Sequence, residues 1–204
     1  DGWRSHGASH RDFMLEFHGE PHTARFTRLH GGALQLTVDG NTAVAALRDV
    51  YAGRGQLACL IVSKRDVEHR FDAESAQRLI RDGAAHLIGN PANAEVQLIA
   101  LGAYQLDEAI KAQQHLAELG KCACVTVVLE PGRLRMPRDA IEAEFVDDDV
   151  TVSTLFPSGL PRVIVTHTRP EPMLGILRRI DSGPAKTRAL GYISRGGTFD
   201  VPGM

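Results

Sequence analysis

Two nearly continuous apolar segments with a helical pattern between them dominate the second half of this 204-residue chain. Residues 95–102 read EVQLIALG and residues 122–129 read CACVTVVL, as buried strands do. Between them, residues 103–120 carry apolar side chains at helical spacing and end in Gly120. Strand, helix and strand in succession predict a βαβ unit, whose strands are parallel and are covered on both faces.

The same alternation continues toward the C-terminus. PRVIVTH at 161–167 predicts a third buried strand, and PEPMLGILRRI at 170–180 predicts a helix, with prolines at its start and arginines in its last turn. ALGYIS at 189–194 follows. We therefore expect an α/β domain in which helices cover both faces of a mostly parallel sheet, a three-layer arrangement.

The first half alternates less regularly and predicts part of a second α/β unit. ARFTRLH and ALQLTV flank Gly31-Gly32 and predict either a hairpin or two strands joined by a turn. The other expected elements are a buried strand at 57–63 and helices at 43–52 and 72–84, the first capped by Asp39-Gly40-Asn41-Thr42.

Asn90-Pro91-Ala92-Asn93 favours neither helix nor strand and is the best predicted boundary between domains. The expected domains are residues 1–90 and 91–204. The chain begins at Asp1 and stops at Met204 directly after a turn-rich stretch, so we expect it to be a piece of a longer protein.

Composition narrows the classes of partner. The hydrophobic fraction is 43%, charged residues make up 24%, and the formal net charge is −2, without the basic surface that nucleic acid requires. No apolar run approaches the ~20 residues that span a bilayer. We therefore expect neither nucleic acid nor a membrane as partner.

The cysteines and the clustered histidines raise the question of metal. Three cysteines, an odd number, indicate reduced thiols and a cytoplasmic protein. Cys122-x-Cys124 is better explained as small hydrophobic residues on a buried strand than as a metal site. The His18-x3-His22 pair contains Pro21 and has no acidic or thiol partner at suitable spacing, so we expect no metal ligands. Asp147-Asp148-Asp149 is expected to be a solvated loop.

Residues 5–10 read SHGASH and lie outside any hydrophobic period. From the residues alone, His6 and His10 fit a metal site, an active site or a loop without function. Imidazole is the side chain that best transfers protons near neutral pH, which keeps catalysis among the alternatives.

Several short motifs, taken together, resemble the C-terminal portion of the transketolase superfamily of thiamine diphosphate enzymes, and phosphoketolases most closely. Asp39-Gly40-Asn41-Thr42 resembles an Asp-Ala-Asn-Thr helix start, and Ser63-Lys64-Arg65 stands where the family has Ser-Lys-Gln or Ser-Arg-Gln. Gly191-Tyr192 and RGGTFDVPGM resemble a Gly-Tyr pair followed by a turn rich in Gly and Thr. The segment around His10 resembles Asn-Gly-x-Thr-His-Gln, with Arg11 in place of Gln.

The resemblance implies a function for the whole enzyme. A ketose phosphate of the xylulose 5-phosphate or fructose 6-phosphate type would be cleaved to acetyl phosphate and an aldose phosphate. Residues 1–90 would end the pyrimidine-binding domain, and residues 91–204 would form the C-terminal domain. His10 is implied as the catalytic residue, with Lys64, His6 and Arg65 binding the substrate phosphate. Lys64 ends a buried strand, where open parallel sheets bind ligands.

The resemblance also implies what other parts of the protein supply. Thiamine diphosphate and Mg²⁺ would be held by upstream domains, so none is expected on this chain alone, and a homodimer is expected. The alternatives are a transketolase, a sugar-phosphate isomerising relative, or a non-catalytic assembly or regulatory module.

Overall fold

The computed structural model describes residues 32–52, 57–63, 66–137, 139–166 and 168–192. The strands are β1 (Gly32–Leu36), β2 (Leu57–Ile61), β3 (Ala84–Ile88), β4 (Val96–Leu101), β5 (Ala123–Val128), β6 (Arg162–Thr166) and β7 (Thr187–Leu190). The α-helices are α2 (Gly40–Ala52), α3 (Ala73–Asp82), α4 (Ala103–Glu118), α5 (Ala140–Ala143), α6 (Asp149–Leu155) and α7 (Pro170–Ile176). Short 3₁₀ turns are η4 (Pro91–Asn93), η5 (Pro131–Leu134) and η6 (Arg178–Ile180).

The larger sheet has the strand order β3-β5-β4-β6-β7. The neighbours from β5 to β7 are all parallel, whereas β3 is an antiparallel edge strand. This confirms the predicted α/β class and the predicted parallel pairing of the segments at 95–102, 122–129 and 161–167. The smaller sheet pairs β1 with β2, also in parallel.

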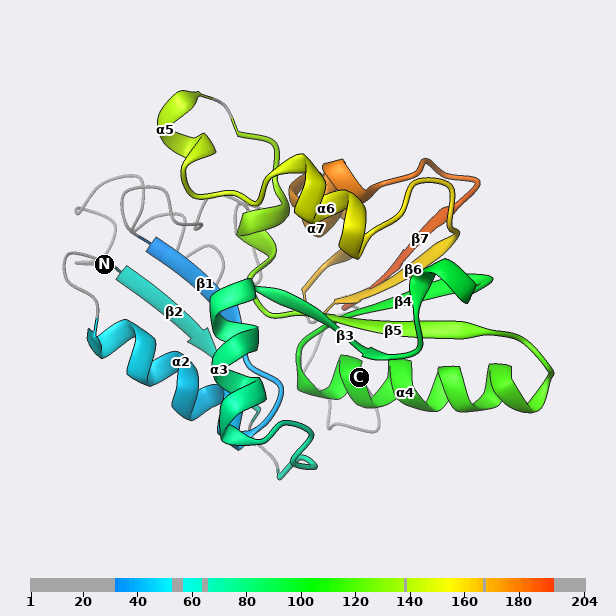
Figure 1. The fold of residues 1–204 in the computed structure, drawn as a ribbon, viewed down its shortest axis with the longest axis horizontal. Helices are drawn as coiled ribbons and strands as arrows, with labels where there is room; N and C mark the ends of the chain where they lie inside the picture. Colours follow the sequence, from blue (N-terminus) through cyan, green and yellow to red (C-terminus); the bar gives the residue numbers. More distant parts are fainter. Residues whose placement is uncertain (1–31, 53–56, 64–65, 138, 167, 193–204) are drawn as a thin grey trace, which may run out of the picture.

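Alternating side chains of the larger sheet enter two different cores. On β4, Leu98 and Ala100 pack toward α4, and Ile99 and Leu101 pack toward α6 and α7. Figure 1 shows α4 on one side of this sheet and α6 and α7 on the other. Burial on both faces explains why these strands are largely apolar, and it produces the expected three layers.

The two sheets share their cores. The α4 core continues into α2 and α3 through Ala46, Ala76 and Leu79, and Leu36 of β1 belongs to the α6–α7 core. A tight turn at Gly83 joins α3 to β3, because its φ of +75° permits the left-handed conformation there.

The predicted boundary between residues 90 and 91 falls at η4, where the Asn90 side chain accepts from the Ala92 N–H at 2.9 Å. The edge strand β3 precedes this point and still pairs with β5 of the larger sheet. The division into residues 1–90 and 91–204 stays a prediction.

Two local predictions need correction. Asp147-Asp148-Asp149 is not a solvated loop: Asp147 is buried beside Arg133, Asp148 caps α6, and Asp149 begins that helix. Cys122 is exposed and precedes β5, whereas Cys124 is buried as expected. Cys122 lies before the first residue of β5, whereas every residue of the strand itself is buried, Cys124 included.

Candidate functional site

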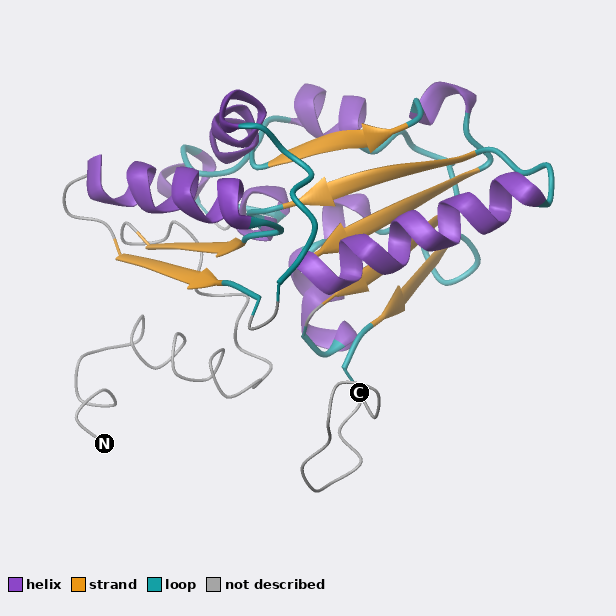
Figure 2. Cartoon of the chain, turned by 90° about the horizontal axis from the view of Figure 1, so that it is seen from below, coloured by secondary structure: helices purple, strands orange, loops and turns teal. Residues whose placement is uncertain are grey.

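The carboxyl ends of the two sheets face each other. In Figure 2, the arrowheads of β1 and β2 point toward the larger sheet, and those of its parallel strands point back toward β1 and β2. A backbone hydrogen bond joins the two edges: the Leu36 N–H, at the end of β1, donates to the Leu129 carbonyl, just after β5, at 2.8 Å. Open parallel sheets bind ligands outside the carboxyl ends of their strands, so this region is the candidate site.

Asp39, three residues past β1, organises the edge of the smaller sheet. Its Oδ1 accepts from the N–H of Thr42 at 2.8 Å and from the Thr42 hydroxyl at 2.9 Å, which caps α2. Its Oδ2 accepts from the N–H groups of Arg70 and Phe71, each at 2.9 Å. One buried carboxylate therefore joins the start of α2 to the segment that leads into α3.

The protonation of Asp39 follows from these contacts. Burial by itself would raise the pKa of this carboxyl group. The N–H groups of Thr42, Phe71 and Arg70 outweigh that effect and hold the pKa of Asp39 below its ordinary value. Asp39 is therefore an ionised structural carboxylate with both oxygens engaged.

Further contacts attach the segment after β2 to its surroundings. The Asn41 amide donates to the Phe71 carbonyl at 2.6 Å. The Arg70 guanidinium donates to Asp107 of α4 at 3.0 and 3.3 Å and also pairs with Glu68 at 2.8 Å. These contacts hold the segment that follows β2 against the larger sheet's helix.

The opposing edge, on the larger sheet, is also polar. Glu130 follows β5 and is 2% exposed. Beyond β6, the hydroxyls of Thr166 and Thr168 lie 3.2 Å apart. The Tyr192 N–H donates to the Thr168 carbonyl at 3.0 Å. Gly191 is required here, because a Cβ on it would lie 2.3 Å from that same carbonyl oxygen.

The predicted site residues His6, His10, Lys64 and Arg65 lie outside the described residues, as do Arg11 and the His18–His22 pair. Ser63, which precedes Lys64, lies two residues past β2 at the candidate edge. The predicted roles of these residues stay predictions.

The described part of the chain offers neither a metal site nor a membrane-spanning helix. There, no group of three or more His, Cys, Asp or Glu side chains could hold a metal ion. Among the same residues, no helix is both long and apolar enough to cross a bilayer.

Sequence reasoning recognised Asp39 as a helix cap but missed its bonds to Arg70 and Phe71, and it missed the buried Glu130. A carboxylate directly after a buried strand was the available signal for Glu130. The Asp39 bonds join residues more than 30 positions apart, and no local pattern indicates them.

No protein-family model matches the sequence, and no curated protein matches it. Its solved structural neighbours are transketolases. A mutant transketolase from Pichia stipitis in complex with fructose 6-phosphate is 16% identical, with a TM-score of 0.57 over 84% of this chain and 22% of that one. Transketolase from Campylobacter jejuni is 12% identical, with a TM-score of 0.54 over 85% of this chain and 23% of that one.

A split-gene transketolase, described as an inactive β4 tetramer, is 14% identical, with a TM-score of 0.56 over 85% of this chain and 52% of that one. These likenesses establish a shared fold. The chain spans about a fifth of the length of the Pichia stipitis transketolase and about half of the split-gene chain.

Proposed function

We propose that this chain is the C-terminal part of a thiamine diphosphate-dependent enzyme that cleaves a ketose phosphate in the manner of a phosphoketolase. The observation that carries the proposal is the transketolase-like fold, within which the Asp39-Gly40-Asn41-Thr42 motif begins the helix after one parallel strand and Ser63 follows the neighbouring strand. The described parts of two motifs that suggested the family, Asp39–Thr42 and Ser63, therefore both follow strands of the smaller sheet.

The described residues do not form a cradle for Mg²⁺ and a diphosphate. Asp39 is the buried carboxylate at the edge of the smaller sheet, and both of its oxygens already accept hydrogen bonds from N–H or hydroxyl groups. We propose that thiamine diphosphate and Mg²⁺ are held by upstream domains of the same protein and that this chain alone binds neither.

The proposed roles within the chain follow from the chemistry of the substrate. Its phosphate requires a fixed cation, for which Lys64 is proposed, with His6 and Arg65 beside it. Proton transfer to and from sugar hydroxyls near neutral pH requires a group such as the imidazole of His10.

Kinetics of the full-length enzyme test these roles. Lys64→Ala should raise KM, because a phosphate contact remote from the breaking bond is made equally in ground and transition states. His10→Ala should lower kcat by roughly 10²–10⁴-fold if the imidazole transfers a proton. Lys111→Ala on the exposed side of α4 is the matched control and should change neither. Unchanged kinetics in both site variants would refute the assignment.

Product analysis separates the enzymatic alternatives. A phosphoketolase converts a ketose phosphate and inorganic phosphate to acetyl phosphate, an aldose phosphate and water. A transketolase needs an aldose acceptor and forms no acetyl phosphate. An isomerising relative needs neither an aldose acceptor nor inorganic phosphate. Acetyl phosphate formation that depends on inorganic phosphate would support the proposal, and its absence with an intact cofactor would contradict it.

A non-catalytic assembly role is the second candidate, and a surface feature of α2 favours it. Val44, Leu47 and Tyr51 recur at helical spacing and are 47%, 44% and 84% exposed. We propose that this face is covered in the whole protein, by upstream domains or by the second copy of a homodimer. A cytoplasmic location is also proposed, since three cysteines, an odd number, indicate reduced thiols rather than a disulfide framework.

A further inference from the structure

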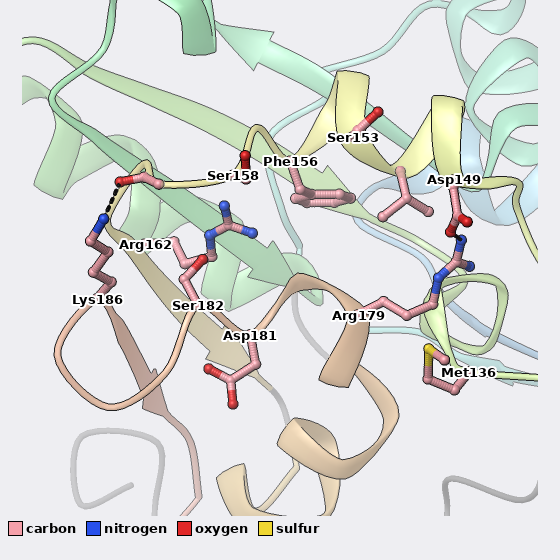
Figure 3. A pocket seen from close by; sticks show the side chains of 12 residues that line it. Met136, Asp149, Ser153, Phe156, Ser158, Arg162, Arg179, Asp181, Ser182 and Lys186 are labelled. Atoms are coloured by element: carbon pink, nitrogen blue, oxygen red, sulfur yellow. Dashed lines mark hydrogen bonds and ion pairs between the residues drawn. The ribbon is translucent and has the colours of Figure 1, made fainter.

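A cavity of about 660 Å³ opens at the amino ends of β6 and β7, the edge of the larger sheet opposite the carboxyl ends (Figure 3). This volume is within the range of small-molecule sites. Its lining includes Val152, Phe156, Ser158, Arg162, Ser182 and Lys186.

Arg162, the first residue of β6, places a positive charge inside the protein at this cavity. It is 2% exposed, and its guanidinium donates to the carbonyls of Ile180 at 2.6 Å and Pro157 at 2.7 Å, and from Nε to Leu160 at 3.4 Å. Among the described residues, no carboxylate pairs with it. A buried charge bonded to carbonyl groups is costly, and burial lowers the pKa of Arg162, an effect that the negative charge of the nearby Asp181 offsets only in part.

The acidic residues of the cavity do not face this guanidinium. In Figure 3, the Asp181 side chain points away from Arg162, and its Oδ1 accepts from the Gly183 N–H at 2.9 Å. Asp149 pairs with Arg179 at 2.7 Å at the other end of the cavity. The Arg162 end is therefore positively charged.

A second cation and two hydroxyls lie at the same end. Lys186 Nζ donates to the Gly159 carbonyl at 3.2 Å, so Lys186 and Arg162 hold the same 157–160 turn. Those contacts leave two N–H groups on the ammonium and two on the guanidinium. Ser158 and Ser182 line the same end, and no described residue bonds to their hydroxyls.

We propose that this end of the cavity binds the phosphate group of a phosphate monoester, with Lys186, Ser182 and Arg162 as donors. Ammonium, guanidinium and hydroxyl groups are the usual partners of phosphate oxygens. The cavity is larger than a phosphate ion and continues along Phe156 and Val152, which offer an apolar wall to the organic part of the ester. This site is independent of the proposed enzyme activity.

Amide NMR titrations of the 204-residue chain with inorganic phosphate and with phenyl phosphate, at constant ionic strength, test the proposal. Saturable shifts should appear at residues 157–162 and 181–187, with phenyl phosphate binding more tightly than inorganic phosphate. Lys186→Ala should raise Kd about tenfold or more, since it removes a charge-assisted contact. Ser182→Ala should raise it less.

Lys111→Ala is the control, because this exposed lysine on α4 is not part of the cavity, and it should leave Kd unchanged. The proposal fails if neither ligand produces saturable shifts, or if Lys111→Ala weakens binding as much as Lys186→Ala does. Equal affinity for both ligands would refute the proposal that the cavity binds the organic part of an ester, and would show a site for the phosphate group only. Because the titration measures binding, its result does not depend on whether the proposed enzyme activity is correct.

Discussion

Replacing Asp39 by alanine should destabilise the fold far more than the loss of a helix cap alone. The carboxylate is 4% exposed, and its loss removes the cap of α2 and leaves the N–H groups of Arg70 and Phe71 without their acceptor. A cap is worth about 1 kcal/mol, and a buried donor left unpaired costs about 1–3 kcal/mol. With one cap and two such donors, Asp39→Ala should lower the free energy of unfolding by about 3–7 kcal/mol.

Asp72 provides a matched control, because it caps α3 through Ser75 and makes no distant bond. Urea unfolding followed by circular dichroism should show a clearly smaller loss for Asp72→Ala than for Asp39→Ala. Asp39→Asn keeps one acceptor oxygen and should fall between Asp39→Ala and the unaltered chain. Equal losses for the two alanine variants would refute the claim that Asp39 joins two segments.

The pH dependence gives a second test of Asp39. Its pKa is lowered in the folded state, so the unfolded chain binds the proton more readily, and the carboxylate stabilises the fold fully above the unfolded pKa of about 3.9. This stabilisation is lost as the pH falls through the folded pKa. The stability gap between the unaltered chain and Asp39→Asn should be constant near neutral pH and shrink below about pH 4. A gap that widens on acidification would contradict the assignment.

Other features yield sharp comparisons. Gly191→Ala should cost about 1–3 kcal/mol of unfolding free energy, since its Cβ would overlap the Thr168 carbonyl, whereas Gly175→Ala in α7 meets nothing within 4 Å and should stabilise by about 0.5–1 kcal/mol. Urea unfolding measures both changes in stability. An unchanged free energy of unfolding in Gly191→Ala would contradict the close approach of residue 191 to the Thr168 carbonyl. Cys122 is exposed and should react quickly with a thiol reagent, whereas burial raises the pKa of Cys124 and should keep it protonated and slow. Mass spectrometry of the labelled peptides distinguishes the two sites.

The parallel strands were predictable because burial on both faces leaves a strong local signal. The runs at 95–102, 122–129 and 161–167 are largely apolar, and each contains a strand of the larger sheet. The edge strand β3 was missed because it is only AAHLI, directly after a helix. Its pairing with β5 depends on a partner about 40 residues away.

The contacts of the Asp147-Asp148-Asp149 side chains also depend on partners that are distant in the sequence. Asp147 is buried because Arg133 donates to it at 2.8 Å, and Asp149 is held by Arg179, 30 residues away. Both arginines are too far from the triplet in the sequence for the spacing of a helix or a turn to predict the contact. A run of acidic residues predicts a solvent-exposed segment unless a distant basic partner is known. The sequence therefore favoured a solvated loop for the three aspartates.

At the candidate edge, the sequence predicted only part of the structural role of Asp39. Leu36 of β1 pairs with Ile61 of β2, so Asp39 and Lys64 are each three residues past the same pair. The motif resemblance made Asp39 part of a helix start and placed Lys64 in the substrate site. The structure shows that Asp39 has no acceptor capacity to spare, because Thr42, Arg70 and Phe71 occupy it. The substrate chemistry proposed for this edge therefore requires side chains other than Asp39, and Lys64 and His10 are the ones proposed.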